Sequence, residues 1–178
     1  MPMPLLRASG MRCAQYMEVP KIHPSIKSQV DKILPSRDLN MEYRPCQVVL
    51  NNGDKLDNVY IAEVDSYFKV WGIMPEDDPG KRYISINDVK DVKESPNRLP
   101  AHLATKLYKA GESGMGYTIF TIIFKNGQRY STYTGNAIDF IDLPNGLIIE
   151  DIIDVIPHEG RKNNPQPGPK YYWCLFKN

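Results

Sequence analysis

Three adjacent acids form the densest group of potential ligand atoms in the sequence. Glu76, Asp77 and Asp78 stand between two prolines, in a stretch whose composition predicts a turn. Hard cations such as Ca²⁺ bind carboxylate oxygens, but calcium loops place their acids at alternate positions, whereas these acids are consecutive. The sequence therefore predicts a solvent-exposed acidic turn, whose charges suit a basic partner surface.

Residues for metal chemistry are few and scattered. The three histidines share no metal-ligand spacing with the three cysteines, and no cysteine pair has the C-x-x-C pattern. An odd, sparse set of cysteines makes no disulfide framework, so we predict reduced thiols. These residues are His23, His102 and His158, with Cys13, Cys46 and Cys174.

Ser113 lies in a glycine-rich stretch but does not form a nucleophile elbow, because methionine rather than glycine stands two positions after it. The stretch instead predicts a linker. We therefore predict no catalytic residue, no metal site and no cofactor. The alternative is an enzyme whose site is assembled in space from residues such as His102, His158 and Glu112.

Aromatic residues are the remaining binding candidates. Tyr67 and Trp71 lie close to Lys69 in the sequence, and Tyr133 lies close to Arg129. Exposed rings beside cations stack nucleic-acid bases, and Tyr, Trp and Arg also anchor protein interfaces. We expect most of the rings in the core. The predicted binding residues are Tyr67, Trp71, Glu76, Asp77, Asp78, Arg129 and Tyr133.

Composition limits the classes of partner. The chain has 178 residues, with 22 Lys and Arg against 21 Asp and Glu, so it lacks the basic excess of a dedicated duplex-binding protein. A hydrophobic fraction of 42% is typical of a globular protein. No apolar run approaches the length of a membrane span, and residues 1–16 lack the apolar region of a signal peptide. We predict a cytoplasmic protein with no membrane partner.

Two asparagine–glycine pairs between apolar runs predict two β-hairpins. The first pair is Asn52-Gly53 and the second is Asn126-Gly127. We expect type I′ turns, in which both central residues have positive φ. Further strands are predicted at residues 67–71 and 82–86.

Helical spacing of apolar residues predicts two helices. The first covers residues 22–34 and is ended by Pro35, and the second covers residues 100–110. A terminal stretch that includes Tyr171-Tyr172-Trp173 is too aromatic to remain in water, and it predicts a final strand.

The two hairpins begin two similar units. After each hairpin comes a closing segment of the same pattern, at residues 86–92 and 149–155. Each segment carries a pair of acids three positions apart, Asp88/Asp91 and Asp151/Asp154. Because the pairs recur in both units, a structural role is favoured over acid–base catalysis. The pattern predicts an internal duplication.

The fold class predicted is mainly β (α+β), with two tandem small barrel or curled-sheet units and one or two short helices. The pattern resembles an SH3-like or Sm-like barrel over residues 45–95 and 117–157, and an Sm-like barrel would imply RNA binding and ring assembly. The predicted divisions are an arm and helix (1–42), a first β unit (43–96), a helix and glycine-rich linker (97–116), a second β unit (117–160), and a proline-rich tail with a final strand (161–178).

These features favour a non-enzymatic protein-interaction module whose partner is another protein. One version is a cytoplasmic immunity-type inhibitor that masks a toxin or an enzyme. The alternatives are single-stranded RNA binding on the barrel surfaces and an enzyme with a site between the two units.

Overall fold

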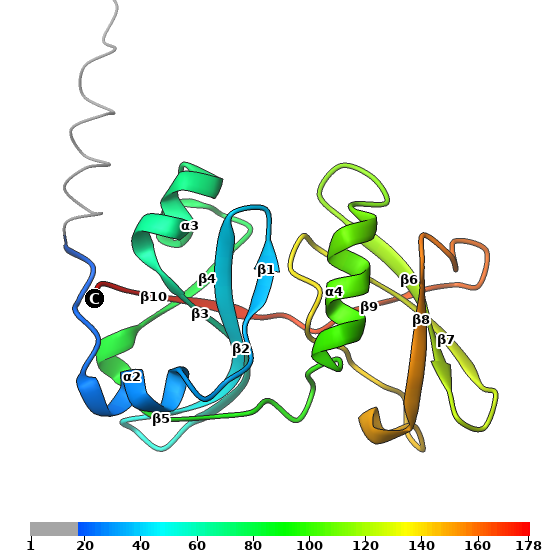
Figure 1. Ribbon diagram of the computed structural model, residues 1–178, viewed down its shortest axis with the longest axis horizontal. Coiled ribbons are helices and arrows are strands. Elements are labelled where there is room, and N and C mark those ends of the chain that lie inside the picture. Colours follow the sequence, from blue (N-terminus) through cyan, green and yellow to red (C-terminus); the bar gives the residue numbers. More distant parts are fainter. Residues whose placement is uncertain (1–17) are drawn as a thin grey trace, which may run out of the picture.

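The computed structural model describes residues 18–178, which form two open β-sheets lying side by side (Figure 1). The fold is mainly β, as predicted, but neither sheet closes into a barrel, and three α-helices are described rather than one or two. Most of the predicted N-terminal arm lies outside the described residues. No described helix is both long and apolar enough to cross a membrane.

The first sheet has six strands and the second has four. The α-helices are α2 (Pro24–Val30), α3 (Val64–Trp71) and α4 (Ala101–Ala110), and the short 3₁₀ helices are η1 (Pro75–Asp77), η2 (Ile86–Asp88) and η3 (Ile149–Asp151). The first sheet contains β1 (Ser36–Asp38), β2 (Met41–Leu50), β3 (Lys55–Glu63), β4 (Arg82–Ser85), β5 (Val89–Lys93) and β10 (Tyr172–Phe176), and the second contains β6 (Thr118–Phe124), β7 (Arg129–Thr134), β8 (Ile152–Pro157) and β9 (Gln166–Pro167).

Both predicted hairpins form, with a turn different from the expected one. Gly53 has a φ of 92° and Gly127 a φ of 82°, but neither preceding asparagine has positive φ. The Gly53 N–H donates to the Leu50 carbonyl at 2.9 Å, and the second hairpin repeats this bond at 2.9 Å. Each turn is therefore a three-residue loop in which a type I turn leads into a left-handed glycine, so the type I′ prediction was wrong.

The closing segments also match in three dimensions. Each is a 3₁₀ turn followed by a strand, η2–β5 or η3–β8, antiparallel to the first hairpin strand. The Asn51 N–H donates to the Asp88 carbonyl at 2.8 Å, and the Lys125 N–H donates to the Asp151 carbonyl at 2.9 Å. The register shifts at the equivalent place in both units, beside Leu50 and Phe124.

The segment predicted as a strand at residues 67–71 is instead the helix α3. Its aromatic and β-branched residues favour a strand locally, but Val64, Tyr67 and Trp71 follow helical spacing. Val64 and Tyr67 are buried against the first sheet, and Gly72 ends the helix in the left-handed conformation with a φ of 65°. Burial of one helical face therefore overrides the strand propensity.

Helices cover both faces of the first sheet. Alternate residues of β3 face opposite sides, so Tyr60 packs in the cluster beneath α3 while Val59 packs in the cluster beneath α2. The second sheet has one helix-covered face, where leucines of α4 pack on Phe120 and Ile122. The helices predicted at residues 22–34 and 100–110 are thus confirmed, with shorter bounds.

The predicted C-terminal strand forms, and it belongs to the first sheet. After β9, the chain leaves the second sheet, crosses the junction between the two sheets, and enters the first sheet as β10 (Figure 1). There β10 lies parallel to both of its neighbours, β3 and β4. Trp173 and Cys174 are buried within it, so the last residues of the chain complete the core of the first unit.

Candidate functional site

A buried carboxylate holds the two units together. Asp139 lies on the segment after β7, has no exposed surface, and accepts hydrogen bonds from Ser36 of β1 and from Tyr108 of α4, the latter at 2.6 Å. Its own N–H donates to the Tyr60 hydroxyl of β3 at 3.0 Å. Burial raises the pKa of Asp139, although these donors and Arg98 oppose the increase. The network fixes the orientation of one unit against the other.

Four tyrosine rings continue this layer across the junction. Tyr171 lies 5.0 Å from Tyr60, Tyr60 lies 5.2 Å from Tyr43, and Tyr43 lies 6.0 Å from Tyr108, measured between ring centroids. All three pairs meet edge to face, which is a favourable geometry for aromatic rings. Tyr171 and Tyr108, at the two ends, each line a hollow in the surface.

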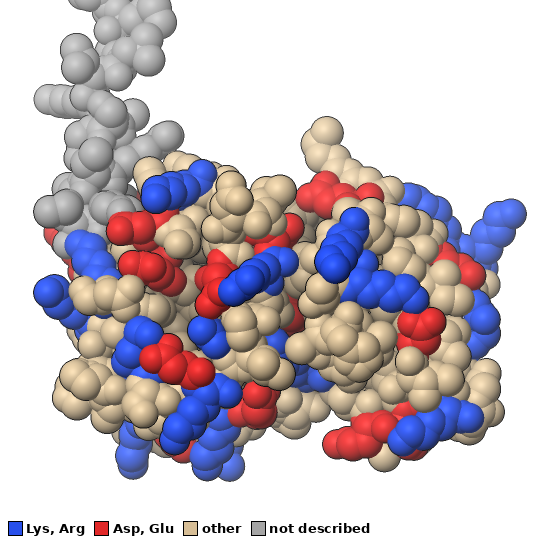
Figure 2. Space-filling view, viewed as in Figure 1, with Lys and Arg blue, Asp and Glu red and all other residues tan. Residues whose placement is uncertain are grey.

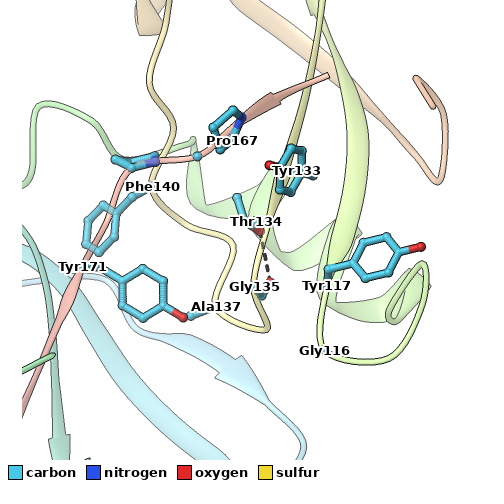
Figure 3. A pocket seen from close by; sticks show the side chains of 11 residues that line it. Gly116, Tyr117, Tyr133, Thr134, Gly135, Ala137, Phe140, Pro167 and Tyr171 are labelled. Atoms are coloured by element: carbon cyan, nitrogen blue, oxygen red, sulfur yellow. Dashed lines mark hydrogen bonds between the residues drawn. The ribbon is translucent and has the colours of Figure 1, made fainter. Parts of the chain in front are cut away.

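The hollow at Tyr171 is an aromatic pocket with a volume of about 280 Å³ (Figure 3). It is built by the second unit and by the C-terminal segment on its way to the first sheet. No charged residue among residues 18–178 lines it. The lining residues are Gly116, Tyr117, Tyr133, Thr134, Gly135, Ala137, Phe140, Pro167, Gly168, Pro169 and Tyr171, and we call this set the aromatic pocket.

The C-terminal segment forms a wall of the pocket because it pairs with the free edge of β7. The Thr132 hydroxyl donates to the Gln166 carbonyl at 2.8 Å, and the Gly168 N–H donates to the Tyr133 carbonyl at 2.7 Å. A Cβ atom on Gly168 would lie 2.7 Å from Thr134, so only glycine permits this approach. Pro167 and Pro169, which flank Gly168, have no N–H to donate to β7.

Rings of the pocket remain accessible. Tyr133, on β7, is 40% exposed and lies beside Pro167 in Figure 3. The Tyr117 ring is 5.5 Å from the Arg161 guanidinium. Tyr171 is half-buried, and its ring packs edge to face against the rings of Tyr60 and Trp173. The pocket therefore combines fixed rings with a rim that solvent reaches.

The hollow at Tyr108 is a groove between the β1–β2 hairpin and α4, with a volume of about 610 Å³. Its rim carries Leu34 and Leu39, which are 62% and 81% exposed. Leu39 has a φ of 52°, a conformation that is unfavourable for a branched side chain. We call this hollow the leucine groove.

The structure separates the predicted aromatic candidates. Tyr133 lines the aromatic pocket, whereas Tyr67 is buried in the core beneath α3 and offers no exposed ring. Trp71 is half-buried and lies under Lys81, whose Nζ is 3.6 Å from a Trp71 ring centroid. Arg129 is exposed and forms an ion pair with Glu159.

The acidic turn forms as predicted, and its residues have different environments. Glu76 and Asp77 are exposed in η1. Asp78 is half-buried, accepts a hydrogen bond from the Gly80 N–H at 3.1 Å, and pairs with Lys81 at 3.3 Å. Among residues 18–178, no group of three or more His, Cys, Asp or Glu side chains is placed to hold a metal ion.

The structure places His102 and His158 at opposite ends of α4. The Nε2 of His158 donates to the Ala110 carbonyl at 3.1 Å, at the end of α4, whereas His102 lies in its first turn. A rise of 1.5 Å per residue places these ends about 12 Å apart. The Nδ1 of His158 contacts Ser113 at 2.8 Å, but the Ser113 oxygen also accepts the Ile119 N–H and lines neither hollow described above. This arrangement ties the loop to the helix end.

Of the residues that line the pocket, Tyr133 alone was a sequence-based candidate, and the large side chains that the sequence reasoning missed are Tyr117, Phe140, Pro167 and Tyr171. The signal for two of them was present, because the proline-rich tail and the aromatic terminus predict a segment that docks on the protein. The place where this C-terminal segment docks depends on the pairing of β9 with β7 and of β10 with β3. No local sequence pattern encodes these pairings.

Comparison with protein families, with characterised proteins and with solved structures gave no match for this chain.

Proposed function

We propose that this protein is a non-enzymatic interaction module that binds an extended segment of a partner protein in the aromatic pocket. The observation that carries the proposal is a concave, uncharged surface of tyrosines and prolines whose rim ring, Tyr133, is 40% exposed. Tyrosine is enriched among the residues that dominate binding energy, because it offers a large contact area and loses little side-chain entropy.

The fold interpretation supports the same function. We propose that the two units are a tandem duplication of an SH3-like unit, because their turns and closing strands share one hydrogen-bond pattern. Domains of the SH3 class bind proline-rich segments in grooves lined by aromatic rings. In this chain, Pro167 already packs beside Tyr133 (Figure 3), so the pocket suits extended, proline-containing backbone.

A narrower version of the proposal is a cytoplasmic immunity-type inhibitor. The exposed Glu76 and Asp77 would meet a basic rim on a toxin or enzyme and speed association. A stoichiometric complex of nanomolar affinity with one such enzyme, together with loss of its activity, is the expected result for this version.

Single-stranded RNA is the second candidate, and two arginine–tyrosine pairs favour it. Arg161 lies 5.5 Å from the Tyr117 ring, and Arg82 lies 5.6 Å from the Tyr172 ring. Bases stack on aromatic rings beside cations. The charge distribution argues against it, because Lys and Arg are interspersed with Asp and Glu on the face shown in Figure 2.

The test is capture of partners from a lysate of the source cells, with and without nuclease, followed by calorimetry with the purified partner. We expect one stoichiometric protein that survives nuclease, and we expect Tyr133→Thr to weaken its binding at least about fivefold. Threonine preserves strand propensity at this position on β7. Partners that are all lost on nuclease treatment would reject the proposal in favour of RNA.

Two control variants locate the binding surface. Ile153→Thr changes an exposed residue of β8, on the opposite edge of the second sheet from the pocket, and should change affinity by less than about twofold. Leu39→Asn changes the leucine groove at a position whose left-handed conformation asparagine tolerates. Loss of binding in Leu39→Asn with retention in Tyr133→Thr would assign the partner to the leucine groove instead.

A further inference from the structure

A second pocket adjoins the aromatic pocket and has the opposite character. It lies where the loop before β4 meets the C-terminal segment, and it has a volume of about 430 Å³. Lys81, Arg82 and Lys170 line it, and no acidic residue from the described part of the chain does. Pro169 and Tyr171 line both pockets, so the two hollows share a wall formed by the C-terminal segment.

Two of the three cations have no carboxylate partner among the described residues. Arg82 contacts the Tyr172 ring and its hydroxyl, the latter at 3.4 Å, and Lys170 is exposed. Only Lys81 is paired, with Asp78 at 3.3 Å. The pocket therefore keeps a net positive charge after its internal pairing is counted.

The third cation is held in a partly desolvated position. The Lys81 side chain is 12% exposed, and its Nζ lies over Trp71 at 3.6 Å and over Tyr67 at 5.3 Å. This Nζ is buried and has no hydrogen-bond acceptor of acceptable geometry in the described part of the chain. Burial lowers the pKa of Lys81, and the Asp78 carboxylate opposes that decrease. An ammonium group placed in this way gains from any further anion that enters the pocket.

We propose that this cationic pocket binds a side-chain carboxylate of the segment that occupies the aromatic pocket, so that the partner presents an acidic, extended peptide. The inference rests on the proposed function and adds the charge of the partner. An apolar residue of the peptide packs against Tyr133 and Tyr171, and a nearby Asp or Glu reaches Arg82 and Lys170. Arginine can hold such a carboxylate through two parallel hydrogen bonds.

A peptide is favoured over nucleic acid by the charge balance of the chain. Three cations suffice for one or two carboxylates, whereas a strand of phosphates gains affinity from a long basic track. The chain has a formal net charge of +1, and the aromatic pocket itself carries no charged lining residue. A single anion-binding point beside an apolar pocket fits a peptide that carries isolated acids.

The experiment measures fluorescence anisotropy of labelled probes on the full chain at low and at physiological salt. The probes are a short peptide of alternating proline and glutamate, the matched peptide of proline and glutamine, and an oligouridylate. We expect the glutamate peptide to bind at least about tenfold more tightly than the glutamine peptide. Arg82→Gln and Lys170→Gln should each remove most of this difference, and added salt should reduce it.

The control is Lys55→Gln, which removes an exposed lysine beside the first hairpin turn and should leave the glutamate peptide's affinity unchanged. Suppose that both peptides bind equally, that Tyr133→Thr abolishes this binding, and that Arg82→Gln does not. This result would overturn the charge inference and leave the proposed function intact. Failure of the glutamate peptide to bind, or tighter binding of oligouridylate, would overturn the inference outright.

Discussion

The two units share a hairpin and a closing strand, but they complete their sheets in different ways. In the second unit, β7 and β8 both pair with β6 within a continuous stretch of chain. In the first unit, a longer connection carries α3 and β4, and the C-terminal strand β10 lies between β3 and β4 in the sheet. The second sheet is therefore largely local, whereas the first depends on residues at the far end of the described chain.

This difference explains where the candidate site lies. Because β10 belongs to the first sheet, the chain must cross the junction after β9, and residues 167–171 form the crossing. This crossing supplies the walls shared by the aromatic pocket and the cationic pocket. Both pockets exist only because the first unit recruits a strand from beyond the second.

The largest effect is expected from Trp173→Ala, which removes the largest buried side chain of β10. Trp173 contacts Tyr43, Tyr60 and Tyr67, so the loss should cost about 3–5 kcal/mol of unfolding free energy. Hydrogen exchange read by mass spectrometry should show loss of protection in β3 and β4 before β6 and β8. Earlier loss in the second sheet would contradict the dependence described here.

A smaller effect is expected at the junction, from Asp139→Ala. The substitution leaves the Ser36 and Tyr108 hydroxyls without their acceptor, which should cost about 3 kcal/mol in urea unfolding. The matched variant Asp139→Asn retains an acceptor and should cost less. An alanine variant as stable as wild type would show that the network contributes nothing to the orientation of the units.

Comparison of wild type with Asp139→Asn should also reveal a pH dependence of stability, whose sign follows from the raised pKa of Asp139. The folded protein holds this proton more tightly than the unfolded chain, whose Asp pKa is about 3.9. Stability from this group is thus present below that value and is lost as the pH rises through the folded-state pKa. Wild type should lose stability relative to Asp139→Asn across that window, and an opposite slope would show that the pKa is lowered.

The smallest effect sharpens the comparison of the two turns. Gly53→Ala and Gly127→Ala each place alanine at a positive φ, and no atom lies within 4 Å of the added Cβ in either case. The cost is therefore backbone strain alone, about 1–2 kcal/mol at each site by thermal unfolding. Asparagine at the same positions should cost less. Clearly unequal costs would indicate that the two turns, despite their shared bonds, have different environments.

Short-range patterns in the sequence were enough to predict both hairpins, the helices α2 and α4, and the closing strands. Each depends on neighbours within a few residues, such as the glycine at the end of each turn. The same reasoning was wrong for α3, because the aromatic and β-branched residues from Tyr67 to Trp71 favour a strand until one helical face is buried on the first sheet. Tyr67 was proposed for binding on the same local evidence, and its burial depends on that packing.

Of the candidate site, the sequence by itself determined the residue types, including Tyr133 and the proline-rich tail that ends in an aromatic run. Only the tertiary structure decided that Tyr117, Tyr133 and Tyr171 line one pocket and that Lys81, Arg82 and Lys170 line the next. The physical reason is that the place of β10 results from burial of its alternate residues on both faces of the first sheet. That burial depends on residues more than a hundred positions apart, which no local pattern records.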